Sequence, residues 1–202
     1  MAQQDIFADI LKRAAAAGIT SAKTADARDW FRDTAQSVTR RINEQSLVSK
    51  APQDRLKSKI LPGRLYMFSY DPKHKQELPY YDRFPVIFPI QPAKDGFLGI
   101  NFHYLPHVYR ARLMDALYTT ASDQRMDDNT RLRISYSVLQ AAAKFRYFKP
   151  CIKHYLNSHV KSRFLFVPPT EWELALFLPL ERFTKASKQT VYSDVRRQLL
   201  KR

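Results

Sequence analysis

The pattern with the clearest chemical implication is a run of basic and aromatic side chains in the last third of the chain. The stretch KFRYFKPCIKHYLNSHVKSRF, from Lys144 to Phe164, contains six Lys or Arg residues, two His residues, five aromatic residues and no acidic residue. Surfaces that bind nucleic acids combine cations, which neutralise phosphates, with aromatic rings, which stack on bases or support the basic stems. The pattern therefore favours contact with a polyanion.

A structural interpretation of the same stretch stays open. Phe145, Phe148, Ile152 and Tyr155 recur at spacings of three and four residues, which is typical of the buried face of a helix. The intervening cations would then form the solvated face of that helix. We expect the aromatic side chains inside and the cations outside. The absence of acids favours a functional surface, because a merely solvated face normally mixes both signs.

Charge is unevenly distributed along the chain. The 202 residues include 34 Lys or Arg and 19 Asp or Glu, which gives a formal net charge of +15. Residues 131–202 hold 15 of the basic and 4 of the acidic residues. Such a basic domain is expected to meet nucleic acid, with anionic lipid or an acidic protein as alternatives. The candidate phosphate-binding residues are Arg131, Arg133, Lys144, Arg146, Lys149, Lys153, Lys161, Arg163, Arg196 and Arg197, helped by Lys201 and Arg202.

Patterns for catalysis or metal binding are weak. The chain has four glycines and no glycine-rich phosphate loop, and its carboxylates do not form the closely spaced set of a two-metal nuclease. Cys151, His154 and His159 offer few ligands for zinc, so a buried thiol and two surface histidines are the favoured interpretation. We expect a protein that is not an enzyme and that uses no cofactor or metal.

Two further histidines, His103 and His107, flank a predicted junction between a strand and a helix. General acid–base catalysis needs an oriented partner, such as Asp82, Asp95 or Asp115, and spacing in the sequence does not show one. A hydrogen-bonded structural histidine is the favoured interpretation.

Hydrophobic periodicity predicts an α+β fold in two parts. Residues 1–60 read as a helical N-terminal arm and linker, with one helix that stops near Gly18 and a second from about Thr24 to Asn43. Residues 61–202 read as a core domain. Three to four antiparallel strands are expected at about 63–105, as a small sheet or SH3-like partial barrel. Helices follow it, interrupted by a strand in KSRFLFVPP and ending in a basic helix.

Prolines constrain the predicted sheet. The apolar segment DRFPVIFPIQP contains Pro85, Pro89 and Pro92, and proline cannot donate to a strand ladder. We therefore expect this strand to lie at an edge or to be bent. Gly99 indicates a bulge or a close backbone contact.

The sequence also bears on the surroundings of the protein. No stretch approaches the roughly 20 apolar residues needed to cross a bilayer, and the beginning of the chain does not have the pattern of a signal peptide. The chain has one cysteine, so no internal disulfide can form. A membrane partner is not expected.

Several segments resemble a family of T4-like contractile-tailed bacteriophage proteins associated with the virion. They are LPGRLYMFSYDPKHKQELPYYDRFPVIFPI, DGFLGINFHYLPHVYRARLMDAL, RLRISYSVL, FKPCIKHYL and SRFLFVPPTEWELALFLPLERF, which together span most of residues 61–184. The family is similar to the DNA end protector that caps packaged genome ends. The resemblance implies a double-stranded DNA partner, other virion proteins as neighbours, and a location in the virion and, during assembly, in the host cytoplasm.

Two functions remain compatible with these features. The first is sequence-nonspecific binding of DNA through phosphate contacts, at genome ends or in the neck region that holds packaged DNA. The second is a structural or adaptor role in the neck, tail tube or baseplate, in which the basic surface docks on acidic virion subunits.

Overall fold

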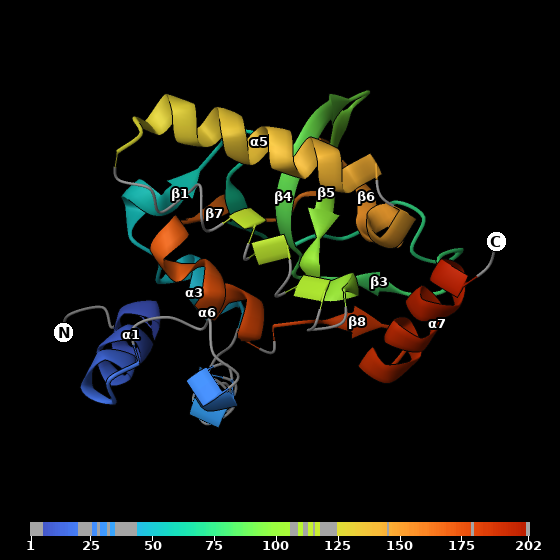
Figure 1. The fold of residues 1–202 in the computed structure, drawn as a ribbon. Helices are drawn as coiled ribbons and strands as arrows, with labels where there is room; N and C mark the ends of the chain where they lie inside the picture. The colour runs from blue at the N-terminus through green and yellow to red at the C-terminus, as the bar shows by residue number, and fades with distance from the viewer. Residues whose placement is uncertain are drawn as a thin grey trace.

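The computed structural model describes residues 6–19, 26–27, 29–31, 33–34, 44–105, 109–110, 113–114, 116–117, 125–144, 146–178 and 180–200. Its centre is a six-stranded antiparallel sheet in the order β1-β7-β2-β4-β5-β6, accompanied by a two-stranded sheet, β3-β8 (Figure 1). The strands are β1 (Leu56–Lys57), β2 (Leu65–Met67), β3 (Tyr81–Asp82), β4 (Val86–Ala93), β5 (Gly96–Asn101), β6 (Ile152–Leu156), β7 (Phe164–Val167) and β8 (Phe183–Thr184).

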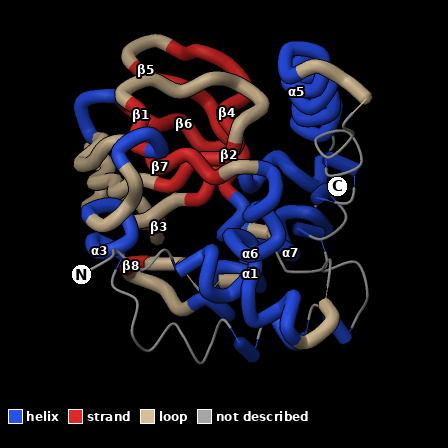
Figure 2. Tube along the Cα trace, turned by 90° about the vertical axis from the view of Figure 1, so that its left-hand side faces the viewer, coloured by secondary structure: helices blue, strands red, loops and turns tan. Residues whose placement is uncertain are grey.

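Helices lie mostly to one side of the strands (Figure 2). The α-helices are α1 (Ile6–Ala16), α3 (Glu44–Ser49), α5 (Asp128–Lys144), α6 (Trp172–Phe177) and α7 (Lys188–Leu200). The 3-10 helices are η1 (Gln53–Arg55), η2 (Phe102–Tyr104), η3 (Arg146–Cys151), η4 (Asn157–His159) and η5 (Pro169–Glu171). In the described ranges, no helix has the length and apolar character needed to span a membrane.

The main core packs helices against one face of the six-stranded sheet. Successive side chains of a strand point to opposite faces, so Leu65 and Met67 of β2 share this face. Leu139 of α5 and Trp172 of α6 are buried in the same core cluster. The ring of Trp172 meets Phe88 of β4 edge-on, with 4.9 Å between their centroids.

The other face carries a separate aromatic cluster. Its buried members are Tyr66, Phe68, Tyr70, Ile87, Phe97, Tyr155 and Phe164. Half-buried Ile60, Val160 and Phe166 pack against it, and among the described residues no α-helix contributes to it. This face is covered by the loops that precede β2 and β7. Residues of both loops line the candidate site described below.

The structure confirms the α+β class and extends the predicted sheet. Strands β1, β6 and β7 lie outside the predicted interval 63–105, and the described strands form an open sheet bounded by β1 and β6 rather than a closed barrel. Strand β4 is central, between β2 and β5, so the alternative of an edge position was wrong. The alternative of a bent strand stays a prediction. The pairing of β4 with β5 does shift in register between Pro89 and Gln91, an irregularity of the kind that bends a strand.

Gly99 makes the close contact that the sequence predicted. A Cβ atom at this position would lie 2.9 Å from Cδ1 of Ile87, so a larger residue would force the end of that side chain to move.

Local capping residues set the helix boundaries at two ends, and the one at Gly18 was predicted from the sequence. The helix α1 is followed by Gly18, whose φ of 72° is the left-handed conformation that ends many helices. At the start of α5, Oδ1 of Asp127 accepts hydrogen bonds from the backbone N–H of Asn129 at 2.9 Å and of Thr130 at 3.0 Å. These bonds satisfy donors that the first turn of a helix leaves free.

The N-terminal sixty residues contact the main core at several points. Ile10, Phe31 and Leu47 are buried in the main core cluster. Residues Leu56 and Lys57 pair with β7. The division into an arm and a core at residue 60 stays a prediction, and the predicted helix from Thr24 to Asn43 falls largely outside the described residues.

Candidate nucleic-acid interface

A depression of about 800 Å³ opens beside the aromatic cluster, between the loop after β1, the end of the β4–β5 hairpin and the loop before β7. We call it the basic groove. Its lining includes four basic residues, Lys57, Lys59, Lys161 and Arg163, and no acidic residue. Unopposed cations around a concave surface attract phosphates, because no carboxylate within the depression offsets their potential.

Strand pairing places one of these cations directly over the aromatic cluster. In the antiparallel pair β1–β7, Lys57 is opposite Phe164 and Leu56 is opposite Leu165. Paired residues point to the same face of a sheet. Leu56 and Leu165 belong to the main core, so Lys57 and Phe164 face the other way, toward the basic groove.

Arg163 is oriented by its own chain. Its guanidinium donates to Oε1 of Gln53 at 3.0 Å and also to the backbone oxygen of Leu56. These bonds hold the side chain against β1 while leaving the residue exposed at the groove. Arg163 is therefore a preformed part of the rim.

A second depression, of about 880 Å³, adjoins the basic groove. Lys161 and Ser162 line both depressions. The second one is also lined by Arg83 and Arg182, and by the ion pair of Lys75 with Asp71 at 3.1 Å. The hydrogen bond from Lys75 is the main reason that the pKa of Asp71 is lowered, and it keeps this carboxylate paired.

Backbone contacts fix Lys161 between the two depressions. The N–H of Lys161 donates to the backbone oxygen of Ser69 at 2.8 Å, and Oγ of Ser162 accepts from the N–H of Ser69 at 2.9 Å. The side chain of Lys161 stays exposed. This residue is thus held where a strand of phosphates that crosses from one depression to the other would pass.

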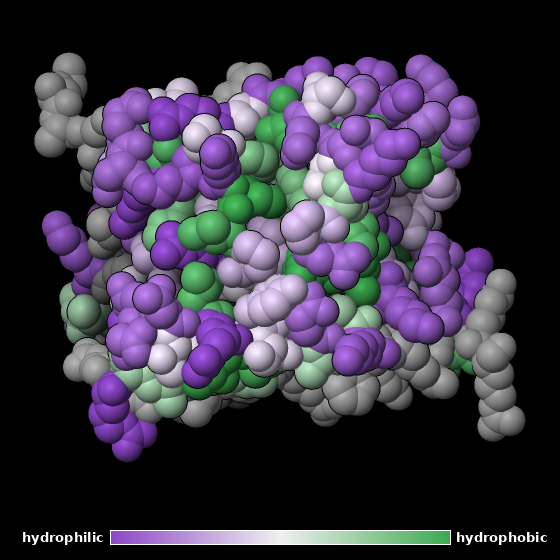
Figure 3. Space-filling model, turned by 90° about the horizontal axis from the view of Figure 1, so that it is seen from above, coloured by the Kyte–Doolittle hydropathy of each residue, from purple (hydrophilic) through white to green (hydrophobic). Residues whose placement is uncertain are grey.

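The structure brings together some of the predicted cations and separates the others. Lys161 and Arg163 lie in the basic groove. Arg131, Arg133 and Lys144 lie on α5, along the top of Figure 1, and Arg196 and Arg197 lie on α7, at its lower right. Arg131 is paired with Asp128 on its own helix. Seen from above, the face that α5 crosses has a hydrophilic periphery and apolar residues in its middle (Figure 3).

The remaining predicted cations follow α5. Lys149 is exposed in η3, which also contains the backbone of Arg146. Lys201 and Arg202 lie outside the described residues. The assignment of these separated cations to phosphate contacts stays a prediction.

The helix that was one of two interpretations of the stretch from Phe145 to Tyr155 does not continue past Cys151. The chain forms η3 as far as Cys151 and then strand β6, which pairs with β5. Tyr155 is opposite Phe97, and their rings stack with centroids 5.5 Å apart. The spacing of apolar residues mimicked a helix, but cross-strand pairing decides the conformation here.

That change of conformation gives Lys153 a different environment from its neighbours in the sequence. Its ammonium lies 4.1 Å from the centre of the Tyr104 ring. Desolvation by burial lowers the pKa of Lys153. The residue is half-buried and makes a cation–π contact, so its charge is committed to its own chain.

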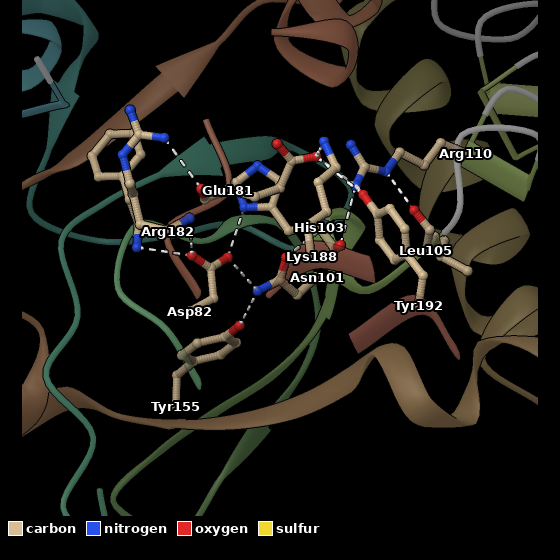
Figure 4. A network of polar contacts seen from close by, with 11 residues as sticks. Asp82, Asn101, His103, Leu105, Arg110, Tyr155, Glu181, Arg182, Lys188 and Tyr192 are labelled. Atoms are coloured by element: carbon tan, nitrogen blue, oxygen red, sulfur yellow. Dashed lines mark hydrogen bonds and ion pairs between the residues drawn. The ribbon is translucent and has the colours of Figure 1, made fainter. Parts of the chain in front are cut away.

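The structure does bring His103 to one of the carboxylates considered in the sequence. Nδ1 of His103 lies 2.7 Å from Oδ2 of Asp82, which also accepts from Nδ2 of Asn101 at 3.1 Å (Figure 4). Asn101 donates further to the hydroxyl of Tyr155 at 3.0 Å. The side chains of His103 and Asp82 are each only 1% exposed, so this arrangement supports the fold. His107 lies outside the described residues.

A second buried network adjoins the first. Arg110, which is fully buried, donates to Oε1 of Glu181 at 2.8 Å and to the hydroxyl of Tyr192 at 2.6 Å (Figure 4). Lys188 adds a second ion pair with Glu181 at 3.0 Å. Burial raises the pKa of Glu181, but attraction to Arg110, His103 and Lys188 outweighs this, and the pKa lies well below its ordinary value.

The cysteine and histidines of the weak zinc pattern are dispersed. Cys151 is fully buried, His154 is exposed, and Nδ1 of His159 lies 2.7 Å from the backbone oxygen of Asp71. Within the described ranges, no group of three or more His, Cys, Asp or Glu residues is arranged to hold a metal ion.

Sequence reasoning missed Lys57 and Lys59 because they fell in the predicted linker. The usable signal was the charge of RLKSK, which has three basic residues in five positions and no acidic residue.

Comparison with known proteins identifies the family. The family described as Phage T4 terminal DNA protecting protein matches residues 4–199, which is nearly the whole chain. Searches of curated proteins and of solved structures found no significant match. On the basis of the family match, the chain belongs to the Phage T4 terminal DNA protecting protein family.

Proposed function

We propose that this protein binds the ends of double-stranded DNA through phosphate contacts and shields them from nucleases. Its family is named for the protection of terminal DNA. The single observation that carries the proposal is the basic groove, where Lys57, Lys59 and Lys161 surround a concave surface that no carboxylate lines. Contacts to phosphates position DNA without reading its sequence, so this surface suits any genome end.

Protection by coverage needs no catalytic group. A protein that occupies a terminus excludes an exonuclease sterically, and its effect follows the number of occupied ends. We therefore propose a role without catalysis. The protein should leave duplex DNA intact during incubation with divalent metal ions.

Two variants that each lack three cations test whether DNA binds in the basic groove or on α5 and η3. The triple variant Lys57→Gln/Lys59→Gln/Lys161→Gln removes three cations from the basic groove, and Arg133→Gln/Lys144→Gln/Lys149→Gln removes three from the predicted patch on α5 and η3. Each lost phosphate contact should reduce the slope of log affinity against log salt by about 0.9. We expect the groove variant to lose about three such contacts, and the matched variant to lose fewer than the groove variant.

Fluorescence anisotropy with a labelled blunt duplex, at several salt concentrations, measures this slope. Digestion of the same duplex by an exonuclease measures protection. If the α5 variant loses more affinity than the groove variant, the predicted patch is the binding surface and the groove is not. If neither variant changes affinity or protection, the proposal of phosphate binding by these surfaces is wrong.

A further inference from the structure

The basic groove has an apolar interior beneath its cationic rim. Phe97 and Phe164 of the aromatic cluster line it, together with Pro89, Pro92 and Val160. Contacts to phosphates alone would not require an apolar interior. Aromatic and apolar walls below a ring of cations fit a nucleotide, which has a flat base at one end and a phosphate at the other.

The interior is preformed. The ring of Phe164 meets Phe68 edge-on at 5.0 Å, and Phe97 stacks on Tyr155 at 5.5 Å. These contacts fix both rings before any ligand arrives. The loss of side-chain entropy when a ligand binds against these rings should therefore be small. The volume of about 800 Å³ is within the range of small-molecule sites and is large enough for a nucleotide.

We propose that the basic groove takes an unpaired nucleotide at the DNA terminus. Its base lies in the apolar interior that Phe97, Phe164 and Val160 line, and its phosphates lie on Lys57, Lys59 and Lys161. This inference rests on the proposed function and adds to it the reason why ends are preferred over internal DNA.

The preference follows from the work needed to free a base. An internal base must lose its partner and both stacking neighbours before it enters a pocket. A base at a blunt end has one stacking neighbour, and a base in a single-stranded overhang has no partner to lose. The groove should therefore bind an overhang best, a blunt end less well, and a duplex without ends least.

Three DNA molecules test this order: a duplex with a short overhang, a blunt duplex, and a covalently closed circular duplex, which has neither ends nor unpaired loops. We expect affinity for the overhang to exceed affinity for the closed duplex by about tenfold, a typical contribution of one stacked base. The fluorescent base 2-aminopurine, placed in the overhang, should change its emission when the protein binds. The same base at an internal position should not change.

A charge-neutral substitution separates this inference from phosphate binding. Ser58 is exposed and lines the groove, so Ser58→Leu narrows the groove and leaves its cations in place. Ser137 is exposed on α5, and Ser137→Leu is the matched control. We expect Ser58→Leu to abolish the preference for overhangs while affinity for the closed duplex stays unchanged.

The possible results are distinguishable. If no DNA binds and the groove charge variants have no effect, the proposed function itself fails. If DNA binds but all three molecules bind equally, or Ser58→Leu behaves like Ser137→Leu, the inference about the terminal nucleotide is overturned and phosphate binding remains. An unchanged 2-aminopurine signal in the overhang would overturn it as well.

Discussion

The ammonium of Lys153 lies 4.1 Å above the ring of Tyr104, whereas Lys161, eight positions later, extends into solvent between two depressions. Both lysines belong to one acid-free stretch of sequence. One is packed against its own chain, and the other is available to a partner.

This contrast predicts different effects on DNA binding. Lys161→Gln should weaken binding and reduce the salt slope by about 1, because it removes one phosphate contact. Lys153→Gln should leave the slope unchanged, because its ammonium is committed to Tyr104. Anisotropy titrations of both variants over a range of salt concentrations measure the two slopes. Equal losses would mean that Lys153 leaves the ring to reach DNA.

The ion pair between Arg55 and Glu171 should stabilise the fold substantially. The guanidinium makes two hydrogen bonds to the carboxylate, at 2.8 and 2.7 Å, and the Glu171 side chain is only 6% exposed. Arg55→Ala removes these two hydrogen bonds from a buried carboxylate and should lower the free energy of unfolding by about 3 kcal/mol. Urea denaturation measures the change.

An exposed ion pair provides the comparison. Arg13 and Asp9 form an i,i+4 pair at 2.8 Å on α1, with side chains 55% and 31% exposed. Arg13→Ala should lower the free energy of unfolding by less than about 1 kcal/mol. A similar cost for both variants would show that residues 53–57 contribute little to the stability of the core.

Glu181 should make stability depend on acidic pH. Its folded pKa lies below the ordinary value of 4.5, so its contribution to stability is complete above that value and is lost as pH falls through the folded pKa. Glu181→Gln should remove this dependence, which amounts to at most about 1.4 kcal/mol per pH unit for one proton. Urea denaturation of both proteins from neutral pH downward measures it. Parallel curves for the two proteins below pH 4.5 would contradict the prediction.

Asp82 should matter for folding and not for DNA binding. It accepts hydrogen bonds from the N–H of Phe84 at 3.1 Å and from Asn101 at 3.1 Å, and it contacts His103 at 2.7 Å. Asp82→Ala leaves these buried groups without the carboxylate that they contact. It should lower the free energy of unfolding by about 3 kcal/mol. Asp54 is exposed, so Asp54→Ala is a control with little expected cost. Loss of DNA affinity in a folded Asp82→Ala protein would place the buried network in the interface.

The single cysteine should report on opening of the core. Cys151 is fully buried, and burial raises the pKa of its thiol to about 12. Only the thiolate reacts with a disulfide reagent, so the folded protein should react slowly and the unfolded protein rapidly. Absorbance measurements with a chromogenic disulfide, with and without urea, compare the two rates. Rapid reaction of the folded protein would show that η3 opens readily.

Local signals were sufficient for several elements. The sequence offers Asp127, Asp128 and Asn129 as adjacent capping candidates, and Asp127 caps α5. Gly18 predicted the end of α1. Both signals are local because capping depends on adjacent residues. Local signals did not predict the central position of β4 or the strand conformation of β6. The three prolines of DRFPVIFPIQP are accommodated in a central strand by a shift of register, and the apparent helical stripe through Tyr155 became a strand paired with β5. Both outcomes depend on residues far away in the sequence.

The amino-acid sequence by itself determined the α+β class, the excess of positive charge, the absence of acids from residues 131–170 and the resemblance to a phage family. Tertiary structure alone decided which cations share a surface. It brought Lys57 and Lys59 together with Lys161 and Arg163, and it placed Lys153 over Tyr104. The other predicted cations that the structure describes lie on α5, η3 and α7. Net charge is a sum over residues, so the sequence alone gives it. Which charged side chains share a surface depends on strand register, and pairing between residues far apart in the sequence sets that register.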